Sequence, residues 1–133
     1  MAITPTPIFC QKPRLETVQV TTANANRDGS TGAYSSAITA GANGSLLDAI
    51  IFQATVTSAA GLVRVFYAAN GSTYRLLAEI VTAAATVSGT VPGNQVVWTP
   101  PGGVPLNLDA NGTLIFNLAN TETWNVHVQL ADY

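Results

Sequence analysis

Charged side chains are scarce in this sequence: of 133 residues, five are Lys or Arg, seven are Asp or Glu, and one is His. Between Glu79 and Asp109 no side chain is ionisable. Acid–base, hydrolytic and metal-dependent reactions need clusters of such groups. The sequence therefore predicts a protein that is not an enzyme and that has no cofactor, no metal site and no catalytic residue.

Basic patches, long apolar runs and paired cysteines are also missing. A net charge of −2 with five scattered basic residues predicts no nucleic-acid partner. No apolar run approaches the ~20 residues that span a bilayer, so no membrane association is expected. The start, Met1–Pro7, has neither the basic nor the apolar region of a signal peptide. The single cysteine, Cys10, fits synthesis in a reducing cytoplasm.

An enzyme built from this chain would depend on Cys10 or His127. No His lies near Cys10 in sequence, so the thiol is expected to be a bystander. His127 falls on the polar side of its predicted strand, with no Ser, Cys or acidic residue at a suggestive spacing, and is expected to be an exposed cross-strand residue.

Proline shapes the N-terminal part of the chain. Pro5, Pro7 and Pro13 exclude both a helix and a central strand. Residues 1–14 are therefore predicted to form an extended arm, followed by one domain over residues 15–133. The alternative is that this segment forms the first edge strand of the domain.

Strand signals dominate the rest of the chain, and no helical period is present. Eight or so short strands punctuated by Gly, Asn and Pro predict a single all-β domain, an antiparallel β-sandwich of jelly-roll-like type. The predicted strands cover residues 17–22, 34–39, 45–58, 62–69, 72–82, 113–118 and 124–130, with a bulged or interrupted strand over residues 86–99, where Pro92-Gly93-Asn94 breaks the pattern.

Two hairpins are predicted within this pattern. Asn70-Gly71 is a strong signal for a two-residue turn, which would pair Val65 with Leu76 and place Arg64 and Glu79 on a solvent-exposed face. A second hairpin is predicted to join residues 113–118 to residues 124–130.

Short motifs in the loops have structural interpretations. Asn43-Gly44-Ser45, Asn70-Gly71-Ser72 and Asn111-Gly112-Thr113 match the glycosylation pattern, but Asn-Gly also supplies the positive φ of tight turns, and turns are expected. Asp109–Gly112 resembles the opening of a calcium loop without the downstream carboxylates, so a turn is again expected.

The two tryptophans are expected to differ. Trp124 alternates with Val126, Val128 and Leu130, which predicts a core position. Trp98 stands before Thr-Pro-Pro; it either caps the open end of the sandwich or forms an aromatic platform for a sugar or a protein.

Three stretches of the chain carry a resemblance to known proteins. They are the start Met1–Phe9 (MAITPTPIF), the segment Thr39–Ile50 (TAGANGSLLDAI) and the ending Val104–Tyr133, with its VPLNL run, Asn-Gly turn and final Asp-Tyr. In these the chain resembles small structural proteins of tailed bacteriophages. The resemblance implies capsid decoration (cement) proteins or minor head or tail components.

The resemblance also implies a partner and a location. It suggests a homo-oligomer, with a trimer favoured, that attaches through its arm to the major capsid protein or another virion shell protein. The expected location is the virion, after synthesis in the host cytoplasm. A proline-stiffened arm loses little entropy on docking and can add as a strand to the edge of a partner sheet.

The residues predicted to contact the partner are Ile8, Phe9, Lys12, Arg14 and Trp98. The alternative function is a carbohydrate-binding β-sandwich on a phage tail or a cell surface. That alternative predicts several exposed aromatic side chains grouped with Asn, Gln or Asp on one face.

Overall fold

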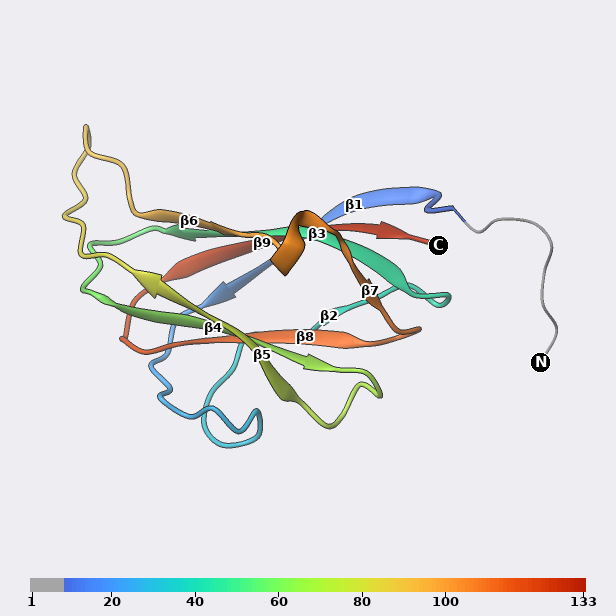
Figure 1. Cartoon of the computed structure of the whole chain (residues 1–133). Coiled ribbons are helices and arrows are strands. Elements are labelled where there is room, and N and C mark those ends of the chain that lie inside the picture. Colours follow the sequence, from blue (N-terminus) through green and yellow to red (C-terminus); the bar gives the residue numbers. More distant parts are fainter. Residues whose placement is uncertain (1–8) are drawn as a thin grey trace, which may run out of the picture.

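The computed structural model describes residues 9–133, which fold into two antiparallel sheets packed face to face (Figure 1). Sheet A has the strand order β1 (Lys12–Val20), β9 (Trp124–Asp132), β3 (Ser45–Ala54) and β6 (Gln95–Trp98), and β7 (Leu106–Leu108) also pairs with β3. Sheet B has the order β2 (Ile38–Thr39), β8 (Thr113–Leu118), β4 (Gly61–Ala68) and β5 (Arg75–Thr82). A short 3₁₀ turn, η1 (Pro101–Gly103), precedes β7. The predicted all-β sandwich is confirmed.

The core forms between the sheets because their strands alternate apolar and polar residues, which sends every second side chain inward. Trp124 is fully buried, as predicted, and Phe52 of sheet A meets Phe116 of sheet B edge to face with ring centroids 5.9 Å apart. Within residues 9–133 there is no helix with the length and apolarity that crossing a membrane requires.

The predicted second hairpin is wrong. Strand β8 lies in sheet B and β9 lies in sheet A, so residues 119–123 carry the chain from one sheet to the other. Both strands do point their apolar side chains at the core. Alternation shows which side of a strand faces the core, but it does not show which sheet the strand joins.

The first hairpin, β4–β5, forms with a longer loop and a different register. The side-chain oxygen of Asn70 accepts hydrogen bonds from the backbone N–H groups of Ser72 (3.0 Å) and Thr73 (2.9 Å), which opens the predicted two-residue turn. A β-bulge follows, and Val65 pairs with Ala78 instead of Leu76. Because this shift is two residues, Val65 still faces the core.

Residues 21–37, which we call the 21–37 loop, lie against sheet B. The predicted strand over residues 34–39 shrinks to β2, and the loop continues along β8 through hydrogen bonds from the Asn24 and Ser35 N–H groups to Leu118 and Phe116 carbonyls (2.8 and 2.9 Å). The ring of Tyr34 packs edge to face on Phe66 at 5.3 Å.

The predicted solvent-exposed position of Arg64 is therefore wrong. Its residue exposure is 3%, because the 21–37 loop covers the outer face of sheet B. The guanidinium donates to the Asn24 carbonyl (3.2 Å) and to Glu79 (3.0 Å), and Glu79 also accepts from Arg27 of the loop (2.8 Å). Sequence periodicity cannot show that a distant loop covers a sheet face.

Strand β1 changes the expected extent of the N-terminal arm. The arm was expected to run to residue 14, whereas Lys12, Pro13 and Arg14 lie in β1 and pair with β9. Pro13 is tolerated there because β1 is the edge strand of sheet A. This pairing matches the alternative of a first edge strand for residues 12–14.

Candidate contact surfaces

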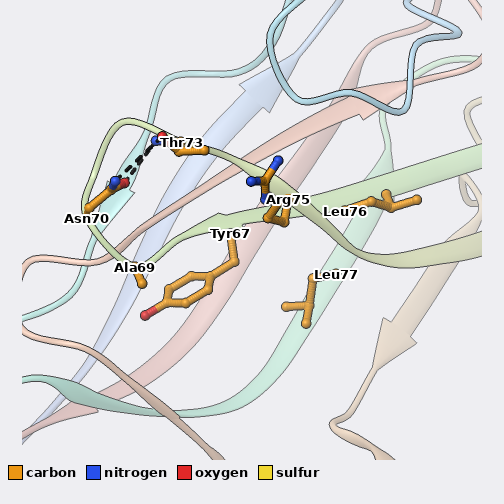
Figure 2. Close-up of a pocket in the computed structure, with 7 residues that line it drawn as sticks. All are labelled: Tyr67, Ala69, Asn70, Thr73, Arg75, Leu76 and Leu77. Atoms are coloured by element: carbon orange, nitrogen blue, oxygen red, sulfur yellow. Dashed lines mark hydrogen bonds between the residues drawn. The ribbon is translucent and has the colours of Figure 1, made fainter.

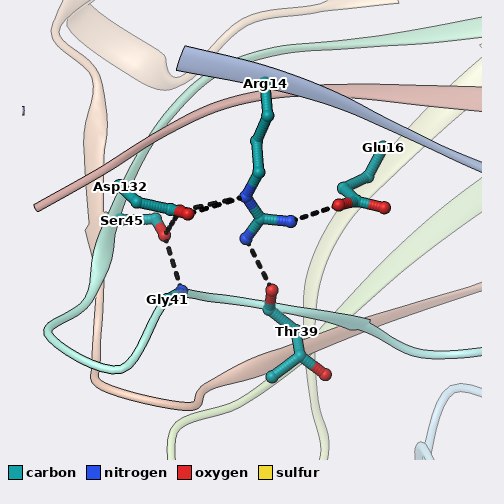
Figure 3. Close-up of polar contacts among 6 residues, drawn as sticks. All are labelled: Arg14, Glu16, Thr39, Gly41, Ser45 and Asp132. Atoms are coloured by element: carbon teal, nitrogen blue, oxygen red, sulfur yellow. Dashed lines mark hydrogen bonds and ion pairs between the residues drawn. The ribbon is translucent and has the colours of Figure 1, made fainter. Parts of the chain in front are cut away.

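The start of β1 is fixed to the rest of sheet A by a polar cluster around Arg14 and Asp132 (Figure 3). Arg14 donates from Nε to the Asp132 carboxylate (2.9 Å), pairs with Glu16, and donates from a terminal nitrogen to the Thr39 carbonyl of β2 (2.7 Å). Just before the strand, the Gln11 N–H donates to the Asp132 carbonyl (2.8 Å). We call Arg14 and Asp132 with these partners the β1 anchor.

Asp132 extends the β1 anchor to β3. Its carboxylate accepts a hydrogen bond from the Ser45 hydroxyl (2.5 Å), and that hydroxyl accepts one from the Gly41 N–H (2.9 Å). Burial raises the pKa of Asp132, but the hydrogen bonds from Ser45 and Arg14 and the charge of Arg14 outweigh it, so the pKa lies below its usual value. The carboxylate is therefore held in its charged form.

The predicted contact residues are only partly brought together. Phe9 lies just outside the β1 anchor, and 70% of its surface is exposed. Lys12 is exposed in β1, whereas Arg14 is half-buried in the anchor. Trp98 is at the opposite edge of sheet A, in β6, where it packs against the core, and Ile8 lies outside the described residues.

A second candidate surface is the outer side of sheet A, which we call the sheet A face. It consists of the side chains that point away from the core, and these line up in rows across the paired strands. The four rows are Gln19–Asn125–Gln53–Gln95, Thr17–His127–Ile51–Val97, Leu15–Gln129–Ala49 and Pro13–Ala131–Leu46–Asn107.

Charge is missing from these rows, and amides are frequent. Gln19 donates to Asn125 (2.9 Å), and Gln95 donates to Gln53 (3.2 Å), so four amides form a line across four strands. Leu15 and Val97 are 59% and 55% exposed. The sheet A face is thus a mixed apolar and amide surface.

The sheet A face is hollowed where β3 has its bulge. A shallow recess of about 310 Å³ is lined by Pro13, Leu15, Gln129 and Asp48, with Arg14 and Leu130 beneath. Asp48 is exposed at the bulge and is a charged group that borders the rows.

A further groove of about 350 Å³ lies beside the β4–β5 loop (Figure 2). Its lining includes Tyr67, Arg75 and Leu77. The Tyr67 hydroxyl accepts from the Asp109 N–H (2.8 Å) and donates to the Asp109 carboxylate (2.9 Å). Burial and the carboxylate of Asp109 raise the pKa of Tyr67. These bonds hold the loop after β7, so Asp109 has a structural role.

Cys10 and His127, the two residues considered for catalysis from the sequence, lie apart, because Cys10 precedes the first residue of β1 and His127 pairs with Thr17 farther along that strand. His127 has Thr17 and Ile51 as cross-strand neighbours, and its Nδ1 shares a hydrogen bond with the Thr17 hydroxyl (2.9 Å). Cys10 lies beside Tyr133, whose pKa is raised by burial and by the nearby thiol. In the part of the chain that the structure describes, no three His, Cys, Asp or Glu side chains are placed to hold a metal ion.

Sequence reasoning missed the sheet A face as a surface. The polar alternation of Asn125, His127 and Gln129 was visible in the sequence. What was not visible is that β1, β3 and β6 set Gln19, Gln53 and Gln95 beside them, because this depends on the strand order.

Comparisons with known proteins identify no family. No protein-family model matches the chain, and no curated protein matches it. Among solved structures, the chain is similar to a chain of the cyanophage Pam1 capsid asymmetric unit, with a TM-score of 0.39 and 15% sequence identity; the alignment covers 99% of this chain and 94% of that chain.

Proposed function

We propose that this protein is a non-enzymatic structural protein of a phage virion that binds the capsid surface and stabilises it, as decoration proteins do. The observation that carries the proposal is that Phe9 is exposed, and that the β1 anchor follows it within a few residues of the chain. A rigid anchor positions the emerging chain, and an exposed aromatic side chain provides apolar area for a partner to bury.

The strand order supports the jelly-roll-like fold that the sequence predicts, and this fold bears on the proposed function. The chain crosses repeatedly between the sheets, with the order β1-β9-β3-β6 in one sheet and β2-β8-β4-β5 in the other. Double-sheet jelly rolls of this kind occur in viral capsid proteins. This is an argument by analogy of fold, and it agrees with the resemblance of the sequence to phage structural proteins.

The carbohydrate-binding alternative has less support. It predicts exposed aromatic rings beside amides, and the amides do gather on the sheet A face. Among the described residues, however, the rows of that face contain no Trp, Tyr or Phe. Trp98 and Trp124 both point to the core side of sheet A.

The test begins with virions of the phage that encodes this chain. Mass spectrometry of purified particles should detect the chain, and the purified full-length chain should sediment with particles that lack it. Replacing Phe9 by Asp should weaken this binding roughly tenfold to a hundredfold, since burial of a Phe contributes ~1.5–3 kcal/mol. The matched control is Val104→Asp, at a site that is 66% exposed and far along the chain.

Two results would overturn the proposal. One is the absence of the chain from purified virions. The other is equal binding of the Phe9→Asp and Val104→Asp variants, which would show that Phe9 does not contact the capsid.

A further inference from the structure

We propose that the sheet A face is a self-association surface, and that two copies of this chain pack through it around a two-fold axis. This inference goes beyond the proposed virion role and does not depend on it, because it concerns the purified chain alone. It also differs from the trimer that the sequence resemblance favours.

The charge pattern of the face suits pairing with itself. In a two-fold interface the same patch occurs on both sides, so a charge close to the axis faces its own copy, with the same sign. The four rows of the sheet A face contain no Asp, Glu, Lys or Arg. Among the described residues, Asp48 at the β3 bulge borders this face, so two copies can approach with little like-charge repulsion if the two-fold axis lies away from the bulge.

The polar groups of the face are also self-complementary. An amide side chain has both donors and an acceptor, so Gln or Asn can bond to a copy of itself, unlike a carboxylate or an ammonium group. Gln19, Asn125 and Gln95 offer amides in one row, where the Gln53 amide already bonds to Gln95 and to backbone carbonyls, and Gln129 and Asn107 contribute to two other rows. Leu15, Ile51 and Val97 supply apolar area between them.

The area is sufficient for a specific dimer. Strand β9 has nine residues, and at ~3.3 Å per residue the sheet is about 30 Å long; four strands at ~4.8 Å make it about 19 Å wide. Each copy would bury roughly 600 Å², so the pair buries about 1,200 Å². That value is at the lower end for specific interfaces. Two sheets stack face to face about 10 Å apart in many sandwiches.

The edges of sheet A are unsuited to the competing arrangement, strand addition. Strand β1 carries Pro13 and the inward-pointing pair Arg14–Glu16, which are devices that block edge pairing. Strand β6 is four residues long and is followed by Pro100 and Pro101. The face, not the edge, is left as the surface for a second copy.

The experiment measures the mass of the purified full-length chain by analytical ultracentrifugation over a range of concentrations. We expect a reversible monomer–dimer equilibrium of the 13.8 kDa chain with a micromolar dissociation constant, in line with the small area. Val97→Arg should raise that constant at least ~tenfold, because two cations enter one interface. The matched control is Val81→Arg, at an exposed apolar site of β5 in sheet B, which should leave the constant unchanged.

A second variant guards against loss of folding. Circular dichroism should show wild-type folding in both variants, and if Val97→Arg does not fold, Leu15→Arg tests the same face from β1. A monomer at every concentration overturns the proposal. So does a trimer that Val97→Arg leaves intact, or an equal effect of Val97→Arg and Val81→Arg. A monomer whose Val97→Arg variant loses virion binding would instead assign the face to the shell and would leave the proposed function standing.

Discussion

The outer faces of the two sheets differ in what covers them. On sheet B the 21–37 loop lies over the strands, so Arg64, Phe66 and Asn117 are buried although they point away from the central core. On sheet A the corresponding side chains, such as Leu15 and Val97, remain exposed. The 21–37 loop therefore forms a third layer over sheet B, and no such layer covers sheet A in the described residues.

This difference explains how sheet B can bury the charge of Arg64. Under the loop, Arg64 is held by Glu79, by the Asn24 carbonyl and by Asn117, and in turn it fixes the loop. The hydrogen bond from Arg27 lowers the pKa of Glu79; burial raises it, and the hydrogen bond and charge of Arg64 add to the lowering, so the net shift is downward. A covered face can bury a charge when partners surround it, whereas the uncharged sheet A face suits an interface that another molecule completes.

The largest expected effect is on packing. Phe66→Ala should lower the free energy of unfolding by ~3–4 kcal/mol, because it removes a fully buried ring that contacts Tyr34. Ile51→Ala, at a half-buried site of the sheet A face, should cost ~1 kcal/mol in dilute solution. Urea denaturation measures both. Equal losses would mean that the loop does not cover sheet B as described.

A smaller effect is expected from the buried cation. Arg64→Met should cost ~2 kcal/mol, since the Asn24 carbonyl and the Asn117 side-chain oxygen lose a donor while the methionine keeps most of the packing. The matched control is Arg75→Met on the exposed part of β5, which should stay within ~0.5 kcal/mol of the wild type. Denaturation should show the difference, and faster hydrogen exchange in the 21–37 loop should accompany it. Unchanged exchange would show that Arg64 does not hold the loop.

The smallest effect concerns the β1 anchor and pH. Because the folded pKa of Asp132 lies below its unfolded value, its charged form stabilises the protein above pH ~4, and this contribution is lost as pH falls through the folded pKa. Asp132→Asn should therefore be less stable than the wild type at pH ~7, and the difference in stability should shrink as the pH falls below ~4. Thermal unfolding at several pH values measures this. A constant difference between the two proteins across that range would contradict it.

Much of the fold could be predicted from the sequence. Alternation placed Trp124, Val126 and Val128 on the core side, and the Asn-Gly pairs marked turns. At Asn111, φ is +58°, as expected for such a turn. The hairpin register was missed because the Asn70 side chain caps a longer loop.

The candidate site was less predictable. Phe9 could be identified as an apolar residue near the start, and its exposure agrees with a contact role. Trp98 is half-buried and packs against the core from β6, which is nearer to the expected cap on the sandwich than to an exposed aromatic platform. The sheet A face itself is built from strands in distant parts of the chain, and no local pattern encodes their order.

By itself, the sequence determined the local properties of this protein: β-strands with one apolar side, turns at Asn-Gly, and a low content of ionisable groups. These follow from residue type and spacing, which act over a few residues. Only the tertiary structure decided which sheet β8 and β9 join, and that residues 21–37 cover sheet B and leave sheet A open. Those outcomes arise from contacts between residues far apart in the chain, whose free energies depend on the packing of the whole molecule.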